Sequence, residues 1–209
     1  MQIAKTLHGV RCTTMEPRNK TKKLLWMLVL CLGFSLQASA QSLAVKTNAV
    51  GWASASMNMG AEVRLANRWT GGLNVSYNPW TFSDNMKWKH IYVSPEARYW
   101  FCSIFAGHFV GANLIYAHYN AGNIDLPFGL SPQLKTERHQ GDYGAVGLFY
   151  GYSWMLSNRW SIEAEVGLGY GFARYKRYDC AVCGTYKGPD EKHMLVPTKA
   201  AISIIYNIK

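Results

Sequence analysis

The sequence lacks the features that mark several common classes of protein. Beyond residue 40 it has no continuous apolar run of about 18 residues, so no helix is expected to cross a membrane. Apolar residues almost nowhere recur at the spacing of a helical face. Gly-x-Ser-x-Gly, phosphate-loop and zinc-protease motifs are absent, so we expect no enzyme and no bound cofactor or metal. The chain is instead rich in glycine (19), tyrosine (13) and tryptophan (8).

Cysteine is also scarce, with 5 in 209 residues. Cys180 and Cys183 form a Cys-x-x-Cys pair, which serves in proteins as half of a zinc site, as a redox pair or as a short disulfide. Zinc would need two more ligands, and His193 is the one candidate nearby. We favour a structural disulfide, because the chain carries an export signal and disulfides persist in exported proteins. Cys102 stands apart in a short turn and is expected to be a free thiol.

The first 40 residues read as that export signal. Four basic residues precede an apolar stretch, 24–36, which is too short to span a membrane, and Ala38-Ser39-Ala40 follows as a small-residue cleavage site. Met15 is an alternative translation start. The sequence therefore divides into a signal peptide, 1–40, and one domain, 41–209.

Half of the formal net charge of +10 belongs to the signal. Its removal leaves 16 Lys and Arg against 11 Asp and Glu. An exported protein does not meet nucleic acid, and no basic helix is visible. We therefore exclude nucleic acid as a partner.

Alternation of residue types dominates the rest of the chain. In residues 160–172 every second residue from Trp160 to Phe172 is apolar, and the residues between include Glu163, Glu165 and three glycines. A period of two places the two sets on opposite faces of a strand. A strand that crosses a bilayer at a tilt needs about 9–11 residues, which this segment supplies. An apolar face for lipid and a small or charged face for a lumen are typical of transmembrane barrels.

Eight such segments follow the signal: 43–52, 56–66, 69–79, 90–101, 108–119, 142–155, 159–173 and 196–208. Apart from a brief first connection, short turns alternate with longer connections, as in outer-membrane barrels. A repeat, Leu65-Ala-Asn-Arg-Trp69 and Leu156-Ser-Asn-Arg-Trp160, marks two of the short turns. The sequence thus predicts an all-β fold, an eight-stranded antiparallel up-and-down transmembrane β-barrel in the outer membrane.

The same parity directs a set of charged residues into the lumen. Its members are Lys46, Glu62, Arg64, Glu96, Arg98, Glu163, Glu165 and Lys199. An eight-stranded barrel is just wide enough to be filled by its own side chains, and buried charges are tolerated when they are paired. We favour a plug of paired charges. A gate formed by arginine partner exchange and a pair of catalytic carboxylates are the alternatives.

Two other functions remain open on the residues alone. A soluble lipocalin-like barrel would turn the same alternation inside out and bind a ligand against its apolar face. A lipid-modifying barrel enzyme would need a histidine with partners near the rim. His108 and His118 share one strand, but no serine and acid partner is readable beside them.

Several runs together resemble one family, DUF3575, an uncharacterised group from Bacteroidota-type bacteria. They are Leu43-Ala-Val-Lys-Thr-Asn48, Tyr77-Asn-Pro-Trp-Thr-Phe-Ser-Asp84, Trp88-Lys-His90, Pro95-Glu-Ala-Arg-Tyr-Trp100, Gly107-His-Phe109, Ile124-Asp-Leu-Pro-Phe-Gly129, Cys180-Ala-Val-Cys-Gly184 and Pro197-Thr-Lys-Ala-Ala-Ile-Ser203. The resemblance implies an outer-membrane barrel of the OmpA-like or OmpX-like kind. Its partners would be outer-membrane lipid and surface or fimbrial proteins, because some relatives lie near fimbrial genes. It implies no activity and no catalytic residue, so we expect a structural or surface-interaction role.

Overall fold

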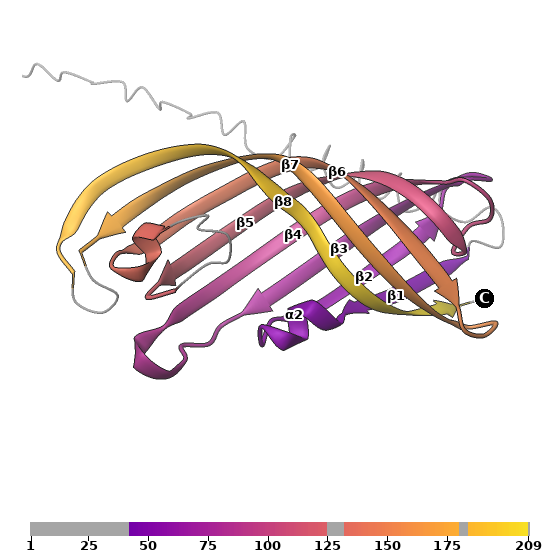
Figure 1. Ribbon diagram of the computed structural model, residues 1–209, viewed down its shortest axis with the longest axis horizontal. Helices are drawn as coiled ribbons and strands as arrows, with labels where there is room; N and C mark the ends of the chain where they lie inside the picture. The colour runs from indigo at the N-terminus through magenta and orange to yellow at the C-terminus, as the bar shows by residue number, and fades with distance from the viewer. Residues whose placement is uncertain (1–41, 125–131, 180–183, 209) are drawn as a thin grey trace, which may run out of the picture. The chain divides into compact units, whose positions relative to one another are not determined.

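The computed structural model describes residues 42–124, 132–179 and 184–208, so the predicted signal peptide and both Cys180 and Cys183 lie outside the described residues. Its strands are β1 (Leu43–Asn48), β2 (Met57–Arg64), β3 (Trp69–Asn78), β4 (Lys87–Trp100), β5 (Gly107–Gly122), β6 (Arg138–Met155), β7 (Trp160–Tyr178) and β8 (Tyr186–Ile208). Within these ranges, three short helices lie in the connections: α2 (Ala49–Ala53), η2 (Ser83–Asn85) and η4 (Pro132–Lys135). Each strand pairs antiparallel with the next, and β8 pairs with β1, so the sheet closes into a barrel (Figure 1).

Several predicted strand boundaries are wrong, and two of these errors have a clear local reason. The first strand ends at Asn48 rather than at residue 52, because the Asn48 side chain accepts a hydrogen bond from Val50 N at 3.0 Å and starts α2. The predicted loop 174–195 is mostly ladder, since β7 and β8 stay paired as far as Tyr178 and Tyr186. The many charged residues of this hairpin suggested a loop in the sequence, but in the structure their side chains pair across the two strands.

The two short turns that carry the sequence repeat share one geometry. Leu65 N and Ala66 N both donate to Trp69 O, at 2.9 and 3.1 Å. Leu156 N and Ser157 N donate to Trp160 O at the same two distances. The repeated residues therefore build the same tight turn twice, and they place a tryptophan at the start of the next strand each time.

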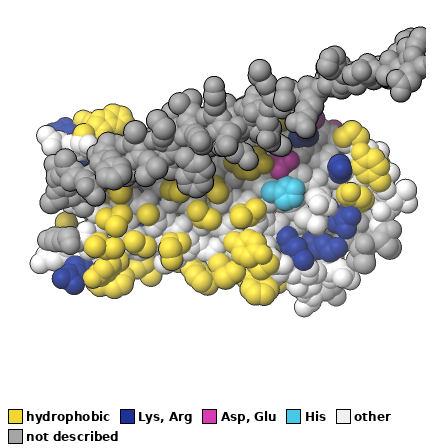
Figure 2. All heavy atoms as spheres, turned by 180° about the vertical axis from the view of Figure 1, so that it is seen from behind, with side chains coloured by type: hydrophobic (Ala, Val, Ile, Leu, Met, Phe, Trp, Pro, Cys, Tyr) yellow, Lys and Arg dark blue, Asp and Glu magenta, His cyan; other side chains and the backbone are white. Residues whose placement is uncertain are grey.

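Apolar side chains cover the outside of the barrel. Leu114, Leu148, Val166, Leu168 and Leu195 are each more than half exposed, whereas Ser161, Glu163 and Glu165 on the other face of β7 are buried. Figure 2 shows hydrophobic side chains spread over the wall, with Lys and Arg gathered toward its ends. A soluble lipocalin-like barrel would have the opposite arrangement, with its apolar face inside. None of the helices in the described ranges is long and apolar enough to span a membrane.

Candidate functional site in the lumen

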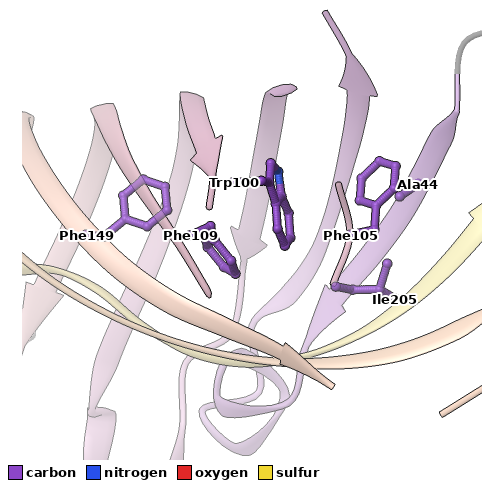
Figure 3. Packing of buried hydrophobic residues seen from close by; sticks show 6 residues of the cluster. All are labelled: Ala44, Trp100, Phe105, Phe109, Phe149 and Ile205. Carbon is purple, nitrogen blue, oxygen red and sulfur yellow. The ribbon is translucent and has the colours of Figure 1, made fainter. Parts of the chain in front are cut away.

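The short-turn end of the lumen is filled by aromatic rings. Trp100, which is fully buried, lies 4.5 Å from Phe109 and 6.0 Å from Phe105 between ring centroids, and Figure 3 shows these rings with Phe149 and Ile205. Gly151 faces inward and leaves room for the aromatic layer, because a Cβ at this position would lie 2.4 Å from Phe109 Cζ. Sequence reasoning missed this layer, although Trp100 shares the parity of Arg98 and was readable as an inward residue.

Next to the aromatic layer lies a cluster of charges centred on Arg98. Its guanidinium is fully buried and contacts all four lumen carboxylates. Arg98 Nη1 lies 2.8 Å from Glu163 Oε2 and 3.1 Å from Glu62 Oε2. Nη2 lies 2.5 Å from Glu165 Oε1 and 2.9 Å from Glu96 Oε1. Arg98 Cζ, the central carbon of the guanidinium, lies 4.6 Å from the Phe109 ring centroid, so the cation stacks on the aromatic layer.

Two lysines complete the cluster. Lys46 Nζ lies 2.5 Å from Glu96 Oε1 and 3.4 Å from Glu62 Oε2. Lys199 Nζ pairs with Glu96 Oε2 and lies 3.7 Å from Glu165 Oε2. Because every carboxylate meets at least one cation, the cluster satisfies the condition under which buried charges are tolerated.

Arg64 is the one predicted member that the structure leaves out. It has the same parity as Glu62 but lies at the last residue of β2, where its side chain is exposed and Nη2 donates to Asn67 Oδ1 at 3.1 Å. The prediction failed because parity gives the face of a strand and not the height along the barrel. Without Arg64 the cluster has four carboxylates and three cations, and Glu163 Oε1 is buried without a hydrogen-bond partner.

The predicted plug fills only part of the lumen. Toward the long connections, the charge cluster forms the floor of a cavity of about 590 Å³. The wall from β5 to β8 is mostly apolar and includes Ile115, Ala117 and Val196, whereas Asn58, Asn74 and other amide and hydroxyl residues come from the first half of the chain. A volume of this size is typical of small-molecule sites. Sequence parity could not reveal the cavity, because its space arises from small inward residues on several strands.

Two polar atoms at the cavity wall have no hydrogen-bond partner. Asn74 Nδ2 and Thr198 Oγ1 are both buried and unpaired, and Thr198 as a residue is only 7% exposed. Buried polar groups are normally satisfied by protein or by a bound molecule. Neither atom is accessible to a water-sized molecule, so both lie beneath the surface of the cavity wall.

The two histidines considered from the sequence, His108 and His118, lie on the outside of the barrel. His118 Nδ1 is 2.9 Å from Asp142 Oδ1, and the Tyr116 hydroxyl donates to the same oxygen at 3.2 Å. This acid partner could not be found from the sequence, because Asp142 comes from the neighbouring strand. His108 Nδ1 lies 2.5 Å from the Tyr150 hydroxyl. Neither histidine lines the cavity.

At the long-connection end, a small group of charges lies beyond the apolar band. Lys187 Nζ is 3.1 Å from Glu137 Oε1, and His139 Nε2 is 3.3 Å from Glu137 Oε2. Burial acts to raise the pKa of Glu137, but hydrogen bonds from Lys187 and His139 outweigh it and hold that pKa below its usual value. Burial lowers the pKa of His139, and the carboxylate of Glu137 opposes this only in part.

Within the described residues, no group of three or more His, Cys, Asp or Glu side chains is placed to hold a metal ion. Comparison with curated proteins and with solved structures found no match. A family model, described as a protein of unknown function (DUF3575), matches residues 25–208. With nearly its whole length matched, the chain belongs to the DUF3575 family.

Proposed function

We propose that the protein is a small outer-membrane β-barrel whose lumen is closed and whose role is structural or surface-interacting. Residues 1–40 would direct its export and be removed. The observation that carries this proposal is the distribution of side chains, with an apolar outer wall around a charged interior. Such a distribution suits a barrel that has hydrocarbon outside, and it would leave a large apolar surface in water.

Aromatic residues at both ends of the apolar wall support a membrane position. At the short-turn end, Trp69 and Tyr99 pack 5.2 Å apart between centroids, and Trp160 and Tyr206 pack 5.0 Å apart. Toward the long connections, Tyr77, Tyr116 and Tyr170 are about half exposed. Aromatic belts of this kind sit at the two membrane interfaces.

The closed lumen argues against a pore. An ion would have to pass both the Arg98 cluster and the ring of Trp100 and Phe109, which lie in series. Contacts with surface proteins are therefore made by the outer surface and the long connections. We propose outer-membrane lipid as the first partner and surface or fimbrial proteins as the second.

Membrane fractionation combined with heat-modifiable gel migration tests the proposal. The full chain, expressed with its N-terminal segment, should fractionate with outer membranes and migrate faster before boiling than after it. The Arg98→Met variant serves as a folding-defective control, because it leaves four buried carboxylates without their central cation. Recovery of the wild-type chain as a soluble monomer without detergent would reject the proposal.

A further inference from the structure

The barrel wall has a notch between α2 and β8. β1 pairs with β8 only from Leu43, opposite Ile208, to Asn48, opposite Ser203. In the described part of the chain, β8 from Tyr186 to Ile202 therefore has a strand partner on one side alone, which is β7. Figure 1 shows α2 about midway along the barrel, while β5 to β8 continue well beyond it.

Side chains form hydrogen bonds with backbone groups at the edges of this notch. Asn48 Oδ1 accepts a hydrogen bond from Ile202 N at 3.3 Å, the first backbone group of β8 beyond the last pair with β1. The Asn58 side chain bonds Asn48 N at 2.6 Å and Asn48 O at 3.0 Å. Both prolines of β8, Pro189 and Pro197, lie in the part without a second partner, where a missing N–H costs least.

The notch would open within the membrane, a step that rests on the proposed function. A strand needs about 9–11 residues to cross the hydrocarbon layer. β1 has 6 residues and β2 has 8, so both end below the outer surface of the bilayer. The rim is apolar, since Val50, Trp52, Met59 and Ile202 are exposed, and α2 has no buried residue. A free strand edge at this depth is tolerated where it borders a cavity.

The lumen cavity reaches this notch. Its lining includes Val50 and Gly51 of α2, Met59 of β2 and Ala200 of β8, which lie on the two sides of the notch. At the long-connection end, Leu134 of η4 lines the cavity and packs with Ala121 and Ile124. The cavity is therefore continuous with the lateral opening, and a hydrophobic cluster covers part of its axial end.

The residues that line the cavity indicate which kind of molecule would bind there. Asn74, Ser94 and Thr198 line the cavity near its polar floor. Lys46 and Lys199 are already bound to carboxylates, and the charge cluster has one carboxylate in excess, so an anionic group gains nothing there. Ile115, Met194 and Val196 give an apolar surface beside them. The geometry points to an uncharged amphiphile with a polar head group.

We propose that this cavity binds the head group of a single-chain, uncharged amphiphile that enters sideways from the outer leaflet. The head group lies on the polar floor beside Asn74 and Thr198, and the hydrocarbon chain leaves through the notch between α2 and β8. Monooleoylglycerol has this chemistry and serves as the probe.

Photo-crosslinking in phosphatidylcholine nanodiscs tests the site. The full-length barrel is irradiated with monooleoylglycerol that carries a diazirine either in the head group or at the chain end. We expect saturable labelling that unlabelled monooleoylglycerol suppresses and oleate does not. The head-group diazirine should label β3 and β8 near Asn74 and Thr198. The chain-end diazirine should label the rim of the notch near Met59 and Ala200.

Matched tryptophan variants of one strand provide the control. Ala117 of β5 is buried and lines the cavity, whereas Ala112 of the same strand is exposed on the outer wall. Ala117→Trp should weaken labelling about tenfold, equivalent to about 1.4 kcal/mol, and Ala112→Trp should not change it. Ala173→Trp, also buried in the cavity wall, replaces Ala117→Trp if that variant does not fold.

Heat-modifiable migration of each variant separates the two proposals. Failure of the wild-type chain to insert overturns both the outer-membrane function and the site. An inserted barrel overturns the site alone if labelling is not saturable, if Ala117→Trp labels like wild type, or if oleate competes better than monooleoylglycerol. Chain-end labelling near Leu134, with head-group labelling outside, would overturn the lateral orientation.

Discussion

Arg98 holds Glu163 through one carboxylate oxygen only. Arg98 Nη1 lies 2.8 Å from Glu163 Oε2, while Glu163 Oε1 is buried without a hydrogen-bond partner. Glu165 differs, because Oε1 meets Arg98 and Oε2 faces Lys199. The two carboxylates alternate along one face of β7, yet they are satisfied to different degrees. Their amide variants should therefore behave differently.

Glu163→Gln should change the free energy of unfolding by less than about 1 kcal/mol. Its amide oxygen can keep the bond to Arg98, its NH2 replaces the unpaired oxygen, and the cluster loses its excess negative charge. Glu165→Gln should cost about 1–3 kcal/mol, because its NH2 would face a cationic donor. Urea unfolding of the barrel in lipid vesicles, followed by tryptophan fluorescence, measures both. Equal losses for the two variants would contradict the assigned contacts.

Arg98→Met should be far more damaging than Arg64→Met. Removal of Arg98 leaves buried carboxylates that face one another, a change that costs about 3–5 kcal/mol. Arg64 is exposed, and its removal should cost less than about 0.5 kcal/mol. The fraction of heat-modifiable protein after refolding gives the comparison. A strong defect in Arg64→Met would place Arg64 back in the charge cluster.

The sequence predicted most of the sheet because the strands alternate between an apolar outer face and a polar or small inner face. Eight segments and the inward parity of Glu62, Glu96 and Glu163 follow from that alternation alone. Lys46, Arg98 and Lys199 follow from it too, and the structure brings these residues together. Contacts across the lumen join residues far apart in the chain; Arg98 and Glu165, for example, are 67 positions apart. The alternation could therefore indicate which charged residues face the lumen, but not which of them pair.

Features that depend on a residue's height along the barrel could not be predicted from the alternation of residue types. Arg64 and Glu62 have the same parity, but only Glu62 lies deep enough to be buried. The early end of β1 depends on one side-chain hydrogen bond of Asn48, which an alternating pattern does not encode. The notch follows from that early end and the cavity from small inward residues, so both appear only when the strands are placed in space.

The wild-type barrel should show no steady conductance in planar bilayers. Phe109→Ala should cost about 3–5 kcal/mol of stability, because it opens the aromatic layer around Trp100. It should still not conduct, since the Arg98 cluster lies next in series and stays paired. Combining Phe109→Ala with Lys199→Ala removes part of both layers and should give measurable ion flow. Steady conductance of the wild type would instead support the arginine gate.

Acid should loosen the start of β6 through His139. The ring stacks on Tyr175, with centroids 4.4 Å apart, and Glu137, Arg177 and Asp190 are the charges around it. Burial holds the pKa of His139 below its usual value of about 6.5. The folded state therefore binds a proton less readily than the unfolded state, so stability falls as the pH drops below about 6.5.

Hydrogen exchange of residues 138–141 at pH 7.5 and 5.5, corrected for intrinsic exchange, measures this effect. Protection should fall at pH 5.5 in the wild type and should change little in His139→Gln, which cannot be protonated in this range. Glu137 does not account for such a difference, because its pKa also lies below its usual value and its contribution is lost only at lower pH. The same loss of protection in His139→Gln would exclude His139 as the titrating group.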